Sequence, residues 1–222
     1  MAEPDRIVVD VVSPALFVGA SADGTGADTD IVTDAHGLPF LPRHRLAARL
    51  RAGAASAVRA APHLREAARA VFGTGGSHGP GRALRLGDAT LSEPTRAAVA
   101  WALARRTDPE RAALRRAVTE ACTAVEAGSE VDPCGAAVPG RLRTNRVLLP
   151  GLRLGARLRW ARRPDAEHWQ CLARACLAVT QAGARGSRGR GRLDVRLALP
   201  GDPDPHATTL HWAGFADRGE RT

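Results

Sequence analysis

Residues 183–192 read GARGSRGRGR, with four glycines and four arginines in ten positions. Glycine lets the backbone approach a ligand closely with its N–H groups accessible, and guanidinium groups match the geometry of phosphate. A strand pattern follows at once, which is not typical of a free linker. A long solvated turn is the alternative to a phosphate-binding loop. We predict that the phosphate contacts come from Gly183, Arg185, Gly186, Arg188, Gly189 and Arg190.

The distribution of charge points to the same kind of ligand. All 32 basic residues are arginine, against 23 acidic ones, for a net charge of +9. Residues 141–192 hold 13 arginines and only two acids, Asp165 and Glu167, so this stretch carries +11 and the rest of the chain −2. Such asymmetry indicates a surface that binds a polyanion, with a solvated basic face as the alternative.

Composition sets the broad class of protein. At 222 residues with 44% hydrophobic side chains, the chain is globular and long enough for a single domain spanning residues 1–222. No apolar run approaches the ~20 residues of a membrane helix, and the first ten residues lack a signal pattern. We therefore expect a cytoplasmic protein with no membrane partner. No CxxC motif is present, which favours buried free thiols over a zinc site at Cys122, Cys134, Cys171 and Cys176.

Elements that would position the basic residues follow from hydrophobic periodicity. Helices are predicted at 42–61, at 94–127 with a break near 107–110, and at 164–183. Strands are predicted at 6–12, 83–91, 141–149, 152–160 and 192–199, and a loop at 19–37. Strands mixed with helices in this order favour an α+β fold of ferredoxin-like (RRM-like) type. We expect a palm of this fold with a helical or thumb insertion at about 92–145 and a glycine-rich loop near the C-terminus.

The predicted strand at 152–160 has two different faces. Leucine, alanine and tryptophan alternate with Arg153, Arg157 and Arg159. A sheet that exposes arginines is one way to hold an RNA backbone. Ordinary solvent-facing arginines would give the same pattern.

The sequence also resembles the RAMP superfamily of CRISPR-associated proteins, in particular the backbone subunit of type III effector complexes. The similar stretches occur in the family's order and span nearly the whole chain. They are GADTDIVTDAHGLPFLPRHRLAARLR (26–51), VFG (71–73) with ALRLGDATL (83–91), RVLLPGLRLGARLRW (146–160) and GARGSRGRGRLDV (183–195).

The resemblance implies a ferredoxin-like palm with a thumb that binds crRNA beside other effector subunits, including copies of itself. It also implies cleavage of the paired target RNA by a loop aspartate with a divalent metal, Mg²⁺ being the expected ion. The matching residue is Asp28, which would hold the metal or help to orient the attacking 2′-hydroxyl. Asp30 and Asp23 are nearby substitutes. The alternative is that these acids only stabilise turns.

The step into the first predicted helix departs from the family. Where the family has Gly-Ser-Ser-Leu-Lys, this chain has Arg-His-Arg-Leu-Ala, so alanine stands in place of the usual lysine. A helix N-terminus already favours anions. The phosphate contacts that the family's lysine would make are therefore assigned to Arg43, Arg45, Arg49 and Arg51.

The sequence thus predicts a crRNA-binding backbone subunit of a type III-like complex, which cleaves guide-paired target RNA through Asp28 as an endoribonuclease. A non-catalytic structural or capping subunit of the same kind of complex is one alternative. An unrelated basic nucleic-acid-binding protein is another. The tail at 201–222 contains no motif, and its HWAGF segment could pack on its own core or on a neighbouring subunit.

Overall fold

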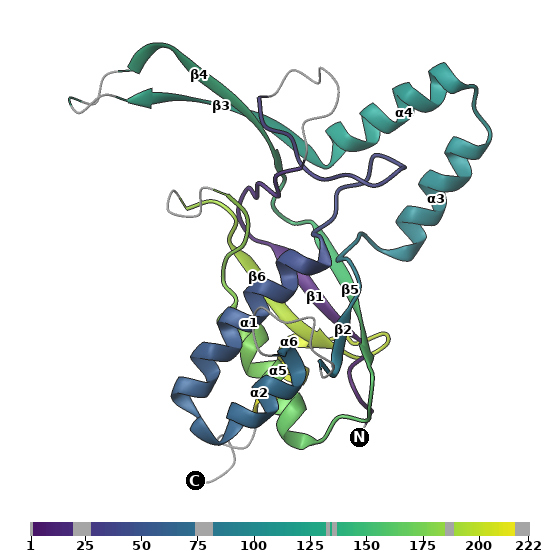
Figure 1. The fold of residues 1–222 in the computed structure, drawn as a ribbon. Coiled ribbons are helices and arrows are strands. Elements are labelled where there is room, and N and C mark those ends of the chain that lie inside the picture. Colours follow the sequence, from purple (N-terminus) through teal and green to yellow (C-terminus); the bar gives the residue numbers. More distant parts are fainter. Residues whose placement is uncertain are drawn as a thin grey trace.

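The computed structural model describes residues 2–19, 28–73, 82–131, 134, 137–184 and 189–215. A palm built on a four-stranded sheet carries two extensions that point in different directions (Figure 1). One extension, which we call the arm, consists of helices α3 (Glu93–Ala104) and α4 (Asp108–Ala121). The other, which we call the hairpin, consists of strands β3 (Thr123–Val131) and β4 (Ala137–Leu148).

The palm sheet has ferredoxin-like topology. Its strands are β1 (Arg6–Val11), β2 (Leu84–Leu86), β5 (Arg153–Trp160) and β6 (Leu193–Ala198), in the order β2-β5-β1-β6. Every neighbouring pair is antiparallel. The first and third palm strands therefore lie in the middle, and the second and fourth at the edges. With a helix after the first and third strands, this is the β-α-β-β-α-β arrangement, and the fold class expected from the sequence is confirmed.

Four helices cover one face of this sheet: α1 (Arg43–Ala60), α2 (Arg65–Phe72), α5 (Ala166–Ala178) and α6 (Pro205–Ala213) (Figure 1). A short 3-10 turn, η1 (Pro62–Leu64), joins α1 to α2. Helix α1 buries Leu46 and Leu50 at one helical spacing, then Gly53, where a side chain would strike the carbonyl oxygen of Ala175 in α5. Glycine at this position lets α1 and α5 pack closely.

Alternation along the palm strands separates the two faces of the sheet, as predicted. In β1, Ile7 and Val9 are fully buried against the helices, and in β5 so are Leu154 and Ala156. The exposed arginines of β5, which are Arg153, Arg157 and Arg159, lie on the opposite face. Because successive side chains of a strand point to opposite faces, the helices cover the apolar face only.

The C-terminal helix α6 was not predicted from the sequence. The carboxylate of Asp204 accepts hydrogen bonds from the backbone amides of His206 and Ala207, and Pro205 occupies the first helical position, where its fixed φ is favourable. Trp212 then packs on the palm core, with its ring centroid 5.2 Å from that of Trp169 in α5. The Trp of the HWAGF segment therefore packs on its own core.

The arm follows β2 and forms where helix was predicted. Thr107 begins α4 with a capping box, in which the side chain of Glu110 accepts a hydrogen bond from the Thr107 backbone amide at 2.8 Å. Helix α4 buries no residue of its own, and α3 buries only Leu103. The arm therefore projects from the palm with most of its surface exposed (Figure 1).

The helix predicted at 94–127 is wrong at its C-terminal end. Helix α4 ends at Ala121, and β3 begins at Thr123. Alanine occurs there too, and it suggested helix, but Thr123 and Val125 are β-branched and pair with Leu148 and Arg146 of β4. Their partners belong to a different strand later in the chain, so the local helical preference is overridden by cross-strand pairing. None of the described helices is long and apolar enough to cross a membrane.

Candidate RNA-binding and cleavage site

Asp28 lies at the root of the hairpin, held against β4. Its carboxylate oxygen Oδ2 accepts hydrogen bonds from the backbone amide of Thr144 at 2.6 Å and from the Thr144 hydroxyl at 3.3 Å. In return, the backbone amide of Asp28 donates to the same hydroxyl at 3.1 Å. Asp28 is exposed, and within the described chain its Oδ1 accepts no hydrogen bond. One carboxylate oxygen thus positions the loop, while the other has no hydrogen-bond partner among the described residues.

Asp30 has a different environment two residues later. Its Oδ1 lies 3.3 Å from Nε of Arg146, and the two side chains are only 13% and 9% exposed. Arg146 also donates to the hydroxyl of Thr123 at 3.3 Å. This ion pair joins the loop to both strands of the hairpin, whereas Asp28 is the acid accessible to a ligand. Asp23, the other substitute, lies outside the described residues.

The arginines predicted on α1 divide into two stripes. Arg43 and Arg51 line a small pocket of about 100 Å³ beside the edge of the palm, together with His44 and Arg82. Arg45 and Arg49, four residues apart, do not line it. Arg82 was not among the contacts predicted from the sequence. It follows α2 in the chain, and the fold places it beside the residues of α1 that line this pocket.

The N-terminus of α1 already has a carboxylate partner. Pro42 is its N-cap residue and supplies no side-chain hydrogen bond, and no acidic residue occurs in its first turn. The backbone amide of Arg43 donates to Oδ1 of Asp88 at 2.7 Å. The first amides of a helix carry the positive end of its dipole and favour a negatively charged group. Here the carboxylate of Asp88 already takes that place, and the amides of Arg45 and Leu46 donate to the Pro42 carbonyl oxygen.

The base of the glycine-rich loop is firmly attached to the palm. The amide of Gly191 donates to the carbonyl of Pro14, and the amide of Ala184 donates to that of Leu16. Gly183 has φ +100°, and a Cβ there would lie 2.7 Å from the Leu16 carbonyl oxygen. The predicted contacts at Arg185, Gly186 and Arg188 fall outside the described residues.

Arg190 in the same loop forms an ion pair with Glu126 of β3. Both side chains are partly buried, at 23% and 30% exposed. The carbonyl oxygen of Arg190 also accepts a hydrogen bond from the Gln181 side chain at 2.7 Å. The arginine predicted to bind phosphate thus connects the glycine-rich loop to the hairpin, and its RNA contact stays a prediction.

The residues around Asp28 fit a limited kind of metal site. Within the described ranges, no group of three or more His, Cys, Asp or Glu side chains could hold a metal ion. Mg²⁺, however, is usually bound through one or two carboxylates, with phosphate oxygens and water completing its shell. A single carboxylate with an accessible oxygen, as at Asp28, fits that mode when RNA supplies the other ligands.

The cysteines do not contribute reactive groups to this region. Cys171 and Cys176 are buried in α5, as predicted, whereas Cys122 is half-buried and Cys134 exposed. Burial raises the pKa of the Cys171 thiol to about 11 and raises that of Cys176 further. Since the thiolate is the reactive form, these two thiols are inert structural groups.

The sheet order, the helices on one face, and the arm and hairpin inserted between β2 and β5 define a ferredoxin-like palm with a thumb. Among solved structures, the chain is similar to one in the cryo-EM structure of Type III-B Cmr-beta bound to cognate target RNA. The TM-score is 0.61 and the identity 10%, over 88% of this chain and 97% of that one. A chain of the apo state of Type III-B Cmr-beta matches with TM-score 0.61 and 10% identity, over 87% and 96%.

No protein-family model and no curated protein matches the sequence. At an identity of 10% the likeness concerns the fold. The comparisons therefore confirm the expected fold, through a likeness to chains of Type III-B Cmr-beta.

Proposed function

We propose that this chain is a crRNA-binding backbone subunit of a type III-like CRISPR effector complex, assembled with other subunits and with copies of itself. What carries the proposal is the extent of the structural likeness, 88% of this chain and 97% of a chain in Cmr-beta bound to cognate target RNA. Ferredoxin-like palms alone serve many unrelated functions. A likeness over nearly the whole of both chains is not confined to the palm.

The guide strand would be held by basic groups around the start of α1 and by the glycine-rich loop. Arg43 and Arg51 share one pocket with Arg82, and the amides at the start of α1 add a partial positive charge. Arg45 and Arg49 form the second stripe of the same helix. Because arginine forks and backbone amides both bind phosphate oxygens, these contacts would hold the RNA backbone without reading its sequence.

Cleavage of the paired target RNA is assigned to Asp28. In the proposed reaction the 2′-oxygen of a target nucleotide forms a bond to the adjacent phosphorus and the bond to the 5′-oxygen breaks. The products are a 2′,3′-cyclic phosphate and a free 5′-hydroxyl, with one proton lost to and one gained from water. Asp28 would orient the 2′-hydroxyl through its accessible oxygen, while Thr144 holds the carboxylate in place. A bound Mg²⁺ would supply stabilisation of the negative charge on the phosphate.

A second candidate is a structural subunit of the same kind of complex, without catalysis. The observation that favours it is the bond between Asp28 and Thr144, which gives the carboxylate a structural role of its own. In this alternative, Asp28 holds the loop against the hairpin and takes no part in a reaction.

The experiment that tests the proposal uses the chain purified with its native partner subunits. Co-purifying RNA is extracted and sequenced, and a labelled RNA complementary to it is then added with Mg²⁺. Repeat-derived RNA and regularly spaced cuts that are absent in Asp28→Asn support the catalytic subunit. Repeat-derived RNA without cuts in either protein supports the structural subunit, and the absence of such RNA contradicts both.

A further inference from the structure

The face of the palm sheet opposite the helices forms a groove that overlaps the proposed RNA-binding residues only at Arg43. It has a volume of about 940 Å³, with a floor that includes Val8 and Gly155 and a wall from residues 90–93 and Arg96 at the start of the arm. Helices α1, α2, α5 and α6 all lie on the other face (Figure 1). We call this hollow the sheet-face groove. It shares Arg43 with the pocket at the start of α1, so the two sites are neighbours.

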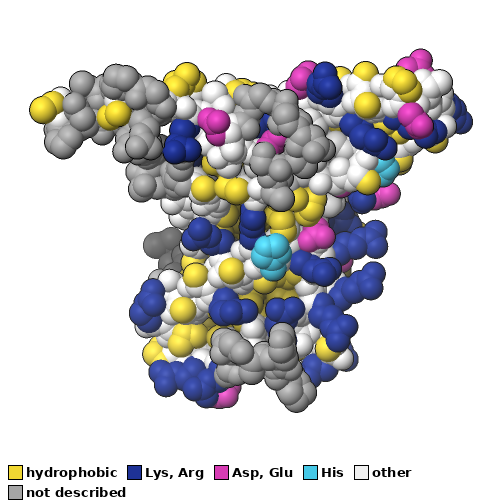
Figure 2. Space-filling view, turned by 45° about the horizontal axis from the view of Figure 1, so that its top comes forward, with side chains coloured by type: hydrophobic (Ala, Val, Ile, Leu, Met, Phe, Trp, Pro, Cys, Tyr) yellow, Lys and Arg dark blue, Asp and Glu magenta, His cyan; other side chains and the backbone are white. Residues whose placement is uncertain are grey.

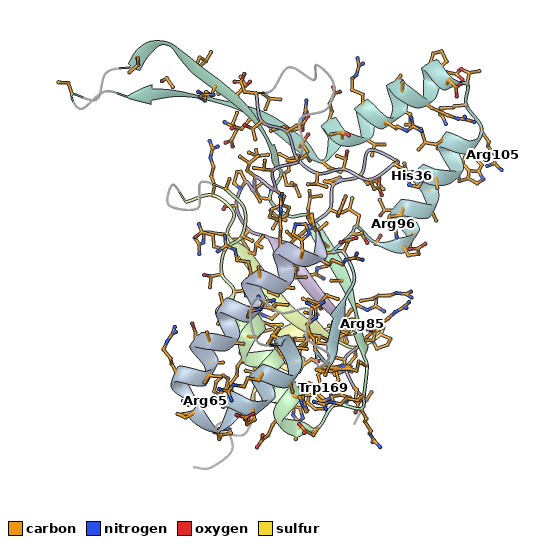
Figure 3. The ribbon with its side chains drawn as sticks, in the orientation of Figure 1. His36, Arg65, Arg85, Arg96, Arg105 and Trp169 are labelled. Carbon is orange, nitrogen blue, oxygen red and sulfur yellow. The ribbon has the colours of Figure 1, made fainter. Side chains whose placement is uncertain are left out.

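Arginine dominates the lining of the sheet-face groove. Seven arginines line it, against the two acids Asp88 and Glu93: Arg6, Arg43, Arg85, Arg96, Arg153, Arg157 and Arg159. Figure 2 shows arginines gathered over the palm, many of them along its edge below the arm, and in Figure 3 Arg85 projects from β2 away from Arg65 on α2.

Three of these arginines are neutralised by ion pairs. Arg6 lies 2.8 Å from Asp5, Arg153 lies 2.7 Å from Asp10, and Arg96 lies 3.2 Å from Glu93. The hydrogen bond from Arg6 lowers the pKa of Asp5, so that carboxylate is charged at neutral pH. Among the described residues, the remaining four side chains form no ion pair or side-chain hydrogen bond: Arg43, Arg85, Arg157 and Arg159.

The strand register places like charges directly opposite each other. Arg85 of β2 is the partner of Arg159 in β5, and Arg157 of β5 is the partner of Arg6 in β1. Like charges directly opposite across a sheet are destabilising. Among the described residues, Arg85 and Arg159 have no acidic partner, whereas Arg6 of the other pair is also bound to Asp5. The repulsion between Arg85 and Arg159 would be relieved by an anion that lies between the strands.

We propose that the sheet-face groove binds the phosphate backbone of single-stranded RNA, as a second RNA path separate from the site at Asp28 and the glycine-rich loop. Alternate residues of β5 are about 6.6 Å apart, a spacing comparable to that of neighbouring phosphates along a strand. None of the described residues that line the groove is aromatic, so these residues offer no ring on which bases could stack, as they do on RRM sheets. The contacts are therefore with phosphates and independent of base sequence.

An acidic protein segment is the competing ligand, and the geometry favours RNA. Peptides that bind to sheets commonly add a strand at an edge, where backbone groups are unpaired. The unpaired arginines instead project from the face, and β5 already has a partner strand on each side. Guanidinium groups spread over a face in this way match a chain with a charge on every unit.

The test compares the Arg85→Ala/Arg159→Ala variant with the wild type. Its control is Arg65→Ala/Arg116→Ala, which removes the same charge from exposed arginines on α2 and α4, outside the groove. Binding of fluorescein-labelled oligo-uridine to the purified chain is measured by anisotropy at several salt concentrations. We expect the groove variant to bind about tenfold more weakly, with a salt slope lower by about 1.4 for two lost contacts. The control should bind as wild type does.

Folding and specificity are checked in the same preparations. Because the substitutions remove a repulsive pair, the groove variant should melt at or above the wild-type temperature, so weaker binding would not reflect unfolding. Wild-type affinity in the groove variant, or an equal loss in the control, would overturn the proposal. So would displacement of RNA by poly-glutamate at equal charge concentration, since this would show a surface for acidic proteins.

The outcome is separable from that of the proposed function. If guide RNA co-purifies and Asp28-dependent cuts occur, but the groove variant binds oligo-uridine as wild type does, only the second RNA path is wrong. If the groove variant loses binding and no repeat-derived RNA is found, the groove stands and the CRISPR assignment does not.

Discussion

The carboxylate of Asp28 accepts a 2.6 Å hydrogen bond from the backbone amide of Thr144, a residue 116 positions further along the chain. This contact fastens the loop after β1 to the second strand of the hairpin. It also means that a change at Asp28 affects both the chemistry proposed there and the geometry of the loop. The two effects can be separated, since only one of the two carboxylate oxygens is engaged by Thr144.

Replacing Asp28 with Asn is expected to abolish cleavage while leaving the fold intact. The asparagine oxygen can still accept from Thr144, but the side chain has lost its charge and its ability to bind a metal strongly. Asp28→Ala should also lose cleavage and should lower the free energy of unfolding by about 1 kcal/mol. Urea unfolding and a cleavage assay on both variants check this. A fully active Asp28→Asn protein would contradict a catalytic or metal-binding role.

Replacing Arg146 with Ala should lower the free energy of unfolding by about 3 kcal/mol. Arg146 is 9% exposed and pairs with Asp30, which is itself only 13% exposed. Removing the cation leaves the carboxylate of Asp30 in a poorly solvated position. The matched control is Arg143→Ala, because Arg143 is exposed on the same strand. Denaturant midpoints measure both, and equal values for the two variants would show that the buried pair does not stabilise the hairpin root.

Two glycines of the C-terminal loop should respond differently to alanine. Gly189 and Gly191 have φ +76° and +71°, so alanine at either is strained by about 1 kcal/mol. A Cβ at Gly189 would meet open space, whereas one at Gly191 would clash with the carbonyl of Ala182. Gly191→Ala should therefore destabilise the chain by more than about 2 kcal/mol. Thermal unfolding of the two variants tests this. An equal loss of stability at both positions would contradict the close approach of Gly191 to the Ala182 carbonyl.

Neutralising Glu126 is expected to strengthen RNA binding if Arg190 contacts phosphate. Glu126 pairs with Arg190 and so competes with an RNA phosphate for it. Glu126→Gln should raise affinity by about threefold at low salt, the range of a partly exposed ion pair. Glu120→Gln removes the same charge from an exposed position on α4 and serves as the control. Equal gains in both variants would indicate a general effect of charge and not a release of Arg190.

The N-cap of α5 should make a pH-dependent contribution to stability. A hydrogen bond from the backbone amide of His168 lowers the pKa of Asp165 below its ordinary value of 3.8. A group with a depressed pKa stabilises the fold above its unfolded-state pKa, and the contribution is lost as the pH falls through the folded-state value. Asp165→Ala should thus lower stability by about 1 kcal/mol at pH 7 and by little at pH values below its folded-state pKa. Urea unfolding of the wild type and of Asp165→Ala at both pH values tests this. A difference in stability between the two proteins that stays the same at both pH values would contradict it.

Short-range patterns in the sequence determined most of the palm. The apolar run of β1, the alternation in β5 and β6, the helical spacing of Leu46 and Leu50, and the helix break near 107–110 all predicted features that the structure contains. These signals are reliable because each depends on contacts between residues a few positions apart, or on one buried face. The arginine face of β5 followed from the same alternation.

Strand pairing of the hairpin could not be obtained in this way. Val125 and its neighbours lie in an alanine-rich stretch with helical preference, and only their partners in β4 make them a strand. The sequence likewise could not show that Asp28 bonds to Thr144, that Asp30 pairs with Arg146, or that Glu126 engages Arg190.

The opposed arginines of the sheet-face groove could not be predicted from the sequence for the same reason. The sequence by itself determined which residues are basic and which face of each strand they occupy, because both depend on residue type and local period. Only the tertiary structure decided that Arg85 stands opposite Arg159, and Arg6 opposite Arg157, because register between strands is set by the packing of the whole sheet.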